Sequence, residues 1–119
     1  MKKTIAKIKN CFSIETCYHG DRAKWSPDNP TTGHCAVASL LLQSMFGGVV
    51  CKTTVNRHTH YFNKIDDNVI DITAEQFKNT PINYNKFLVF NAQNMLKNKD
   101  VKERYNKLLE AFKKTTQGG

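Results

Sequence analysis

Apolar residues recur every three or four positions in three segments of the chain, and each segment predicts a helix. The predicted helices span residues 3–12, 34–46 and 100–114. The middle helix is apolar on almost every turn, so we expect it in the core, and the Gly47-Gly48 pair after it is typical of a helix end. The apolar face of the last helix consists of Val101, Tyr105, Leu108, Leu109 and Phe112.

Between the second and third predicted helices the pattern changes to short runs rich in β-branched residues, which predict strands. Residues 49–55 (VVCKTTV) predict one strand, and residues 58–65 with 69–73 predict a β-hairpin. Residues 73–76 (TAEQ) have the form of a capping box that opens a short helix. The run 86–90 (KFLVF) fits either a further strand or the start of a helix.

The order of these elements predicts an α+β fold, in which a small antiparallel β-sheet packs on helices. Residues 13–30 are expected to form a loop, because glycine and proline interrupt them. We expect one domain over residues 1–119, which is long enough to bury a core. Its last residues, 115–119, are expected to form a loose tail.

The chain carries 18 lysines and arginines against 10 acidic residues, which gives a formal net charge of +8. A basic surface of this kind could attract nucleic acid or an acidic protein. The interleaved aromatic residues and arginines that mark base stacking are sparse, so a nucleic-acid partner is not favoured. No apolar run approaches the roughly 20 residues that span a bilayer, and lysines at positions 7 and 9 interrupt any secretion signal. We therefore expect a cytoplasmic protein without a membrane partner, whose four cysteines stay reduced.

Cys35 stands at the first turn of the apolar helix predicted over 34–46. A helix N-terminus favours the thiolate form of a cysteine, and the thiolate is the reactive form. The N–H groups of the same turn could stabilise an oxyanion when a carbonyl is attacked. Cys35 is therefore a candidate nucleophile. The alternative is that it is a small buried residue at the start of a core helix.

A nucleophilic cysteine needs a base, and four histidines are available. His34 is adjacent in sequence, so its side chain points away from that of Cys35, and His19 lies in the predicted loop. His58 and His60 share one face of a predicted strand, because strand side chains alternate. His60 is a candidate base at a workable distance from the cysteine.

Asp71 is a candidate for the group that orients this histidine. If Asp67 and Asn68 form a two-residue turn, Asp71 lies opposite Lys64. If residues 64–67 form the loop, Asp71 lies opposite His60. Both registers place Asp71 on the same face as His60, whereas Asn63 falls on the opposite face. The sequence leaves the register open.

Several motifs resemble the YunG-like family of small bacterial and phage-associated proteins: CFSIET (11–16), KWSPDNPTTGHCAVASLLLQSMFGG (24–48), HYFNKIDDNVIDITAEQF (60–77) and RYNKLL (104–109). That family is similar to compact papain-like and transglutaminase-like cysteine hydrolases, with a cysteine at a helix N-terminus. The resemblance implies a core of this type, with Cys35 as nucleophile, His60 as base and Asp71 as orienting residue. Two positions depart from the family pattern, because His34 replaces a glutamine that could shape the oxyanion site and Phe62 replaces a tryptophan.

Three further residues are assigned to substrate binding. Trp25 would form a wall of the site or anchor its loop to the core. His34 would act next to the nucleophile, and His58 would line the cleft beside the base. The alternative role for the cysteines and histidines is to bind zinc, but no Cys-x-x-Cys pair occurs. The candidate zinc ligands are Cys11, Cys17, His19, Cys35, Cys51, His58 and His60. We therefore expect no metal and no other cofactor. The terminal Gly118-Gly119 is expected to be part of the tail.

These features predict a thiol hydrolase or acyltransferase that acts on an amide, isopeptide or thioester bond, with a protein or peptide substrate. The alternative is a non-catalytic basic binding protein on the same scaffold, for example a phage-encoded inhibitor of a host protein. Its contact surface would be the C-terminal helix, including Lys102, Arg104 and Lys107. The sequence does not determine the oligomeric state.

Overall fold

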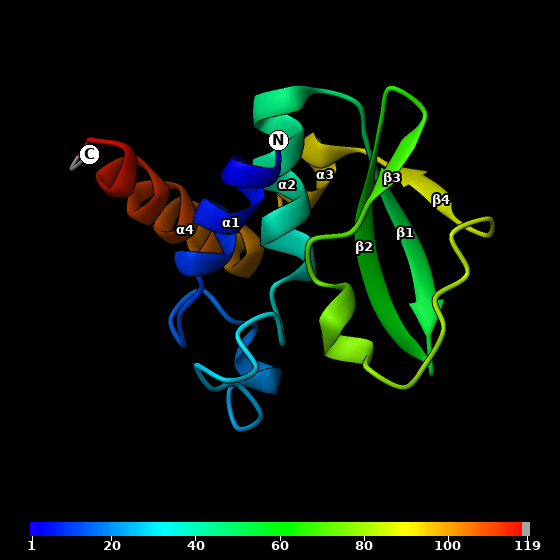
Figure 1. Cartoon of the computed structure of the whole chain (residues 1–119), viewed down its shortest axis with the longest axis horizontal. Helices are drawn as coiled ribbons and strands as arrows, with labels where there is room; N and C mark the ends of the chain where they lie inside the picture. The colour runs from blue at the N-terminus through cyan, green and yellow to red at the C-terminus, as the bar shows by residue number, and fades with distance from the viewer. Residues whose placement is uncertain (118–119) are drawn as a thin grey trace.

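The fold has a helical side and a sheet side, with one helix between them (Figure 1). The structure is a computed structural model that describes residues 1–117. Its α-helices are α1 (Lys2–Asn10), α2 (Cys35–Phe46), α3 (Ala92–Met95) and α4 (Lys99–Gln117), and its 3₁₀ turns are η1 (His19–Asp21) and η2 (Ala74–Phe77). The strands are β1 (Val49–Val55), β2 (His58–Ile65), β3 (Asn68–Ile70) and β4 (Leu88–Phe90). They form one antiparallel sheet in the order β3-β2-β1-β4.

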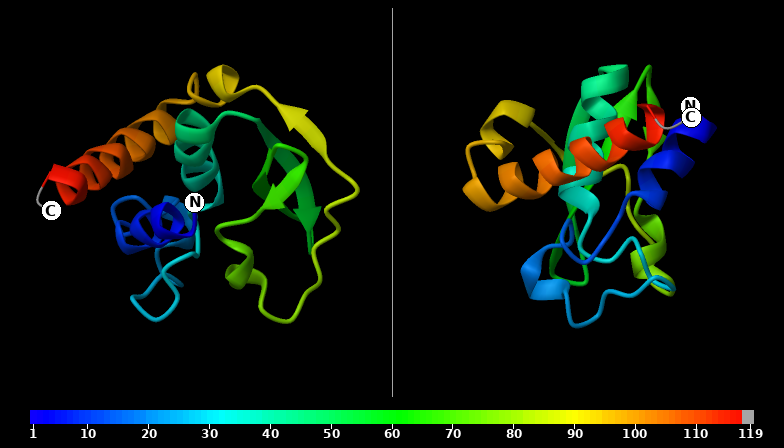
Figure 2. Two further views of the ribbon diagram at one scale, coloured as in Figure 1. Left: turned by 45° about the horizontal axis from the view of Figure 1, so that its top comes forward. Right: turned by 90° about the vertical axis from the view of Figure 1, so that its left-hand side faces the viewer.

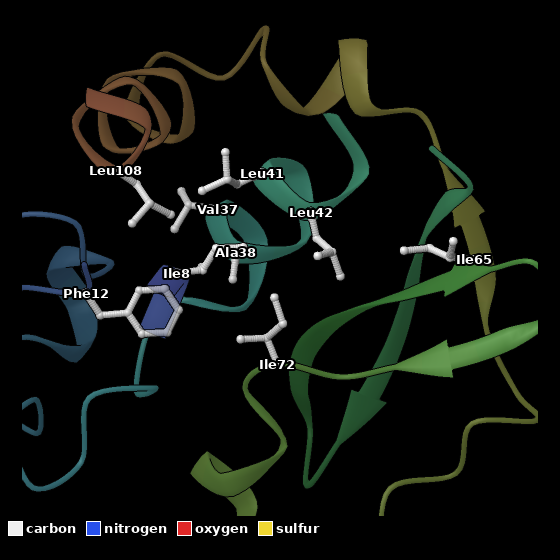
Figure 3. Close-up of a cluster of buried hydrophobic side chains, with 9 residues drawn as sticks. All are labelled: Ile8, Phe12, Val37, Ala38, Leu41, Leu42, Ile65, Ile72 and Leu108. Atoms are coloured by element: carbon white, nitrogen blue, oxygen red, sulfur yellow. The ribbon is translucent and has the colours of Figure 1, made fainter. Parts of the chain in front are cut away.

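Helix α2 lies between the sheet and the helices α1 and α4 (Figures 1 and 2). It is apolar on nearly all sides because it packs against both. The largest core cluster gathers around it (Figure 3) and consists of Ile8, Phe12, Val37, Ala38, Leu41, Leu42, Ile65, Ile72 and Leu108. The α+β fold with a small antiparallel sheet on helices is thus confirmed.

The predicted helices and strands are present, with changes at their ends. The loose tail predicted from residue 115 is wrong for residues 115–117, which continue α4. Gly118 and Gly119 lie outside the described residues. The run 86–90 resolves as the edge strand β4, paired with β1. No helix within residues 1–117 has the length and apolar character needed to cross a membrane.

The predicted capping box is wrong in its contacts, although a short helix does begin there. Residues 74–77 form the 3₁₀ turn η2, and the Thr73 side chain makes no cap hydrogen bond to its backbone. The backbone N–H of Gln76 donates instead to the carbonyl oxygen of Thr73 at 3.1 Å. The side-chain amide of Gln76 donates to Thr73 Oγ1, also at 3.1 Å. Tertiary contacts of Gln76, described below, explain this arrangement.

Two tight turns fix the register of the sheet. Asn56 and Arg57 join β1 to β2, and Asp66 and Asp67 join β2 to β3, all four with positive φ. Positive φ at both central residues is the geometry of a type I′ turn, whose twist suits a two-residue hairpin. Asparagine and aspartate tolerate this conformation better than most residues. The turn at Asp66-Asp67 pairs Ile65 with Asn68, so neither predicted register is correct.

Because Gly33 has no side chain, the loop that contains Cys17 can pack closely against the segment that leads into α2. The φ of Gly33 is +75°, and a Cβ built there would lie 2.5 Å from the sulfur of Cys17. Any other residue would therefore be strained and would also clash. Gly47, at the end of α2, has a similar φ of +76° but nothing within 4 Å of such a Cβ.

We expect Gly33→Ala to destabilise the fold more than Gly47→Ala. Backbone strain alone should cost about 1–3 kcal/mol at Gly47, and the clash with Cys17 should add about 1–3 kcal/mol at Gly33. Urea unfolding of both variants and the wild type measures the difference. Equal losses in the two variants would mean that the contact between Gly33 and Cys17 is unimportant.

Candidate active site

Loop 13–18 holds the segment that leads into α2. The backbone N–H of Tyr18 donates to the Gly33 carbonyl at 3.0 Å. The thiol of Cys17 donates to the Thr32 carbonyl at 3.3 Å, and His34 Nδ1–H donates to the same oxygen at 2.9 Å. The first turn of α2 is therefore fixed in position, with Cys35 half-buried at its start. The N–H groups of such a turn have no acceptor within the helix.

A buried histidine–carboxylate pair lies on the sheet side. His60 Nε2–H donates to Asp71 Oδ2 at 2.7 Å, and the side chains of His60 and Asp71 are 0% and 5% exposed. The Tyr84 hydroxyl donates to the same oxygen at 2.8 Å, and the Thr73 backbone N–H donates to Oδ1 at 3.2 Å. Three donors thus stabilise the Asp71 carboxylate, as burial of a charge requires. Burial and the bond to Asp71 raise the pKa of Tyr84, which keeps its hydroxyl protonated.

The sheet register explains how Asp71 reaches His60. If the pairing of Asn63 with Ile70 continued, Phe62 would pair with Asp71. Asp71 therefore lies on the same face as His60, two residue pairs along the strands. Strand β3 ends at Ile70, and the chain leaves the sheet at Asp71. The carboxylate can therefore reach diagonally to His60. The predicted face is correct although the predicted registers are not, because every register with the same parity keeps these two side chains on one face.

The other imidazole nitrogen of His60, Nδ1, faces the side-chain amide of Gln76. Gln76 Nε2 lies 3.3 Å from His60 Nδ1. Burial lowers the pKa of His60, but hydrogen bonds with Asp71 and Cys35 and the charges of these two groups outweigh it and raise the pKa to about 9. The edge of the His60 ring also faces Phe77, with the ring centres 5.0 Å apart. The structure thus brings together Cys35, His60 and Asp71, which are far apart in the sequence.

Cys35 lines an open cleft of about 1170 Å³. The cleft is bounded by residues 28–33 before Cys35, by residues 75–80 around η2, and by residues of β2 and α4. Figure 1 shows the start of α2 between the long loop that precedes it and the turn η2. The volume exceeds the roughly 300–1,000 Å³ of sites for small ligands, so a larger substrate could enter.

The three residues assigned to substrate binding lie in different environments. His58 is exposed and lines the cleft. Trp25 does not line it, and its Nε1–H donates to the Pro30 carbonyl at 3.0 Å, which anchors the loop. His34 is fully buried and does not line it either. We therefore retain only His58 at the cleft.

His34 instead holds two loops together. Its Nδ1–H donates to Thr32 O, so Nε2 accepts from the Thr16 hydroxyl, 2.7 Å away. Its ring stacks on Phe12, with the ring centres 4.2 Å apart. Burial lowers the pKa of His34 to about 4, which leaves the ring neutral. Neutrality suits a side chain with one donated and one accepted hydrogen bond.

Two residues beside His60 and Asp71 are absent from the sequence-based site. Gln76 appears in the sequence only within the capping-box pattern and a family motif. Tyr84 lies between η2 and β4, where no periodic pattern marks it. Since Tyr84 acts through a contact between segments, no local signal could have identified it.

The remaining cysteines are separate thiols. Cys17 and Cys51 are buried, and Cys11 is half-buried. Burial raises the pKa of Cys17 to about 11 and also raises the pKa of Cys51, so both stay protonated near neutral pH. Within residues 1–117, no group of three or more histidine, cysteine and acidic side chains is arranged to hold a metal ion.

The fold and the site define an α+β protein that places a helix-terminal cysteine beside a buried histidine–carboxylate pair. The sequence pattern described as YunG protein matches residues 1–117, and the chain belongs to this family. A protein of Bacillus subtilis (strain 168), described as uncharacterized protein YunG, is 37% identical over 90 residues, which are 76% of each chain. No solved structure matches the chain.

The two buried histidines should give stability an optimum near pH 6.5. The pKa of His60 rises on folding from 6.5 to about 9, so its contribution is complete below pH 6.5 and is lost as the pH rises to 9. The pKa of His34 falls from 6.5 to about 4, so its contribution is complete above pH 6.5 and is lost as the pH falls to 4. Each change amounts to about 3 kcal/mol at most.

Urea unfolding between pH 4 and pH 9 measures this dependence. We expect His60→Gln to flatten the alkaline side of the curve and His34→Gln to flatten the acidic side. A wild-type curve that stays level from pH 6.5 to pH 9 would contradict the role of His60.

Proposed function

We propose that this protein is a cysteine hydrolase or acyltransferase that acts on an amide, isopeptide or thioester bond. The observation that carries the proposal is that Cys35, which lines an open cleft, lies beside the buried pair of His60 and Asp71. A helix-terminal thiol beside a carboxylate-oriented imidazole is the arrangement of nucleophile, base and orienting group found in thiol catalysis. The same arrangement supports the finer assignment of a papain-like or transglutaminase-like core.

Each of the three groups has a role in the proposed reaction. His60 Nδ1 accepts the proton of the Cys35 thiol, and the sulfur forms a bond to the substrate carbonyl carbon while the π-electrons move to oxygen. When the intermediate collapses, His60 returns the proton to the leaving amine or thiol, and a thioester with Cys35 remains. Water or a second amine then attacks the thioester, which releases an acid or a new amide.

Asp71 keeps the imidazole in the required orientation. Its bond to Nε2–H leaves Nδ1 as the nitrogen that can take the thiol proton and stabilises the protonated ring, consistent with the pKa of about 9. Tyr84 and the Thr73 N–H hold the carboxylate in place in turn.

The cleft supports a protein or peptide substrate. It is open and extends on both sides of Cys35, from η2 to the residues of α3 and α4 that line it. Peptide cleavage, deamidation and acyl transfer share the thioester intermediate, so all three remain within the proposal. A reducing cytoplasm would keep the thiol of Cys35 available.

Selective alkylation tests the proposal. We expect iodoacetamide to modify Cys35 at least ten times faster than Cys11, because only Cys35 adjoins an imidazole, and we expect His60→Ala to remove most of this difference. Intact mass and peptide mapping over time measure both rates. Cys11 is a suitable control because it is also half-buried. Equal labelling of Cys35 and Cys11, unchanged by His60→Ala, would disprove the proposal.

A second candidate is the non-catalytic binding protein, supported by the exposed lysines of α4, which include Lys102 and Lys107. Arg104 is not part of that surface, contrary to the sequence-based prediction. It is 5% exposed, its Nε–H donates to Asp100 at 3.0 Å, and its Nη1 donates to the Thr16 carbonyl at 3.3 Å.

The two candidate functions can be distinguished by expressing variants of the protein in a bacterial host and measuring growth. If binding is the function, Lys102→Glu with Lys107→Glu should remove any growth effect of the wild type, and Cys35→Ser should retain it. If catalysis is the function, Cys35→Ser should remove the effect. Growth rates of the three strains make the comparison.

A further inference from the structure

The residue before the nucleophile does not face the cleft. The family pattern has a glutamine at position 34, which led us to expect a contribution to the oxyanion site there. In the structure this side chain points to Thr16 and Phe12 and is fully buried. Position 34 therefore supplies no side-chain donor to a substrate bound at Cys35.

A different side-chain amide lies beside the catalytic groups. Gln76 lines the cleft together with Cys35, and its Nε2 lies 3.3 Å from His60 Nδ1, the ring nitrogen that is not bonded to Asp71. The other hydrogen of the same amide is directed to Thr73 Oγ1 at 3.1 Å, and Thr73 is 1% exposed. The backbone of Gln76 is held by its bond to the Thr73 carbonyl. The amide is thus fixed at two points, with one N–H on the side of His60 Nδ1.

We propose that Gln76 is a catalytic residue whose side-chain N–H stabilises the oxyanion formed when Cys35 attacks a carbonyl group. This inference rests on the proposed function and identifies the electrophile as an sp² carbonyl group. An amide, ester or thioester forms an oxyanion when it is attacked, whereas an alkyl group does not. The donor would act together with the N–H groups at the start of α2.

The protonation state of His60 determines whether the Gln76 N–H is available to a substrate. In the neutral ring Nδ1 is an acceptor and can receive the Gln76 N–H, whereas in the protonated ring Nδ1 is a donor and cannot accept. The pKa of His60 is about 9, so the ring is mostly protonated near neutral pH. The Gln76 N–H then has no acceptor at Nδ1 before the attack begins, and it can donate to the oxyanion as the π-electrons of the carbonyl move to oxygen.

Two reagents separate this role from a purely structural one. Iodoacetamide forms a carbon–sulfur bond at an sp³ carbon and expels iodide, so no oxyanion arises. p-Nitrophenyl acetate acetylates the thiol through an oxyanion and releases p-nitrophenolate, which is measured by its absorbance. The variants are Gln76→Ala and Gln76→Met, which keeps the length of the side chain. Gln93→Ala is the matched control, because Gln93 is exposed and does not line the cleft.

We expect both Gln76 variants to slow the acetylation of Cys35 about 10- to 100-fold and to leave its alkylation within a factor of two. Gln93→Ala should change neither rate. Cys35→Ser measures the background from other nucleophiles. An unchanged pH profile of alkylation in Gln76→Met would show that His60 is still correctly placed.

Three results would overturn the inference. Acetylation could be unaffected in both Gln76 variants, both reactions could slow equally, or the pH profile of alkylation could shift, which would make Gln76 a positioning residue for His60. In each case selective, His60-dependent alkylation of wild-type Cys35 would leave the proposed function intact. If the proposed function is wrong, Cys35 of the wild type will show no selective alkylation.

Discussion

The buried hydrogen bond between His60 and Asp71 is the constraint on which the site depends. A carboxylate that is 5% exposed requires donors on both oxygens, and it obtains them from the imidazole, the Tyr84 hydroxyl and the Thr73 N–H. These donors come from β2, from the segment after β3 and from the irregular segment before β4. The hydrogen bonds to this one charge therefore fix three parts of the chain around the site. They also leave Nδ1 as the His60 nitrogen for the proposed proton transfer.

On the helical side, other contacts fix the segments around the start of α2. Gly33, Thr32 and the loop before them hold the start of α2, and Arg104 connects this loop to α4 by its bond to Thr16. The Arg104 cation is balanced by Asp100 and lies over the Tyr18 ring, 5.6 Å from its centre. The Arg104 charge is thus used to hold the loop that positions Cys35, and it is not presented to a partner.

The proposed chemistry arises where the two sides meet. Neither side holds all of the proposed catalytic groups. Cys35 comes from α2, whereas His60, Asp71 and Gln76 come from the sheet, the segment after it and η2. Since α2 packs against the sheet through the core in Figure 3, the stability of the core and the geometry of the site are coupled. The YunG family pattern extends over residues 1–117, which contain both sides.

The sequence by itself determined the local elements and the face of the candidate residues in the hairpin. Periodicity located the three long helices, and alternation placed His60 and Asp71 on one side of a hairpin whatever register of that parity it adopted. Only the tertiary structure decided the turn at Asp66-Asp67, the inward position of His34, the burial of Arg104 and the contacts of Gln76 and Tyr84. The physical reason is the distance along the chain over which each feature is set. Periods of two and 3.6 residues follow from the local backbone, so they are visible in the sequence. These hydrogen bonds join segments that are far apart in the sequence, and no sequence pattern marks them.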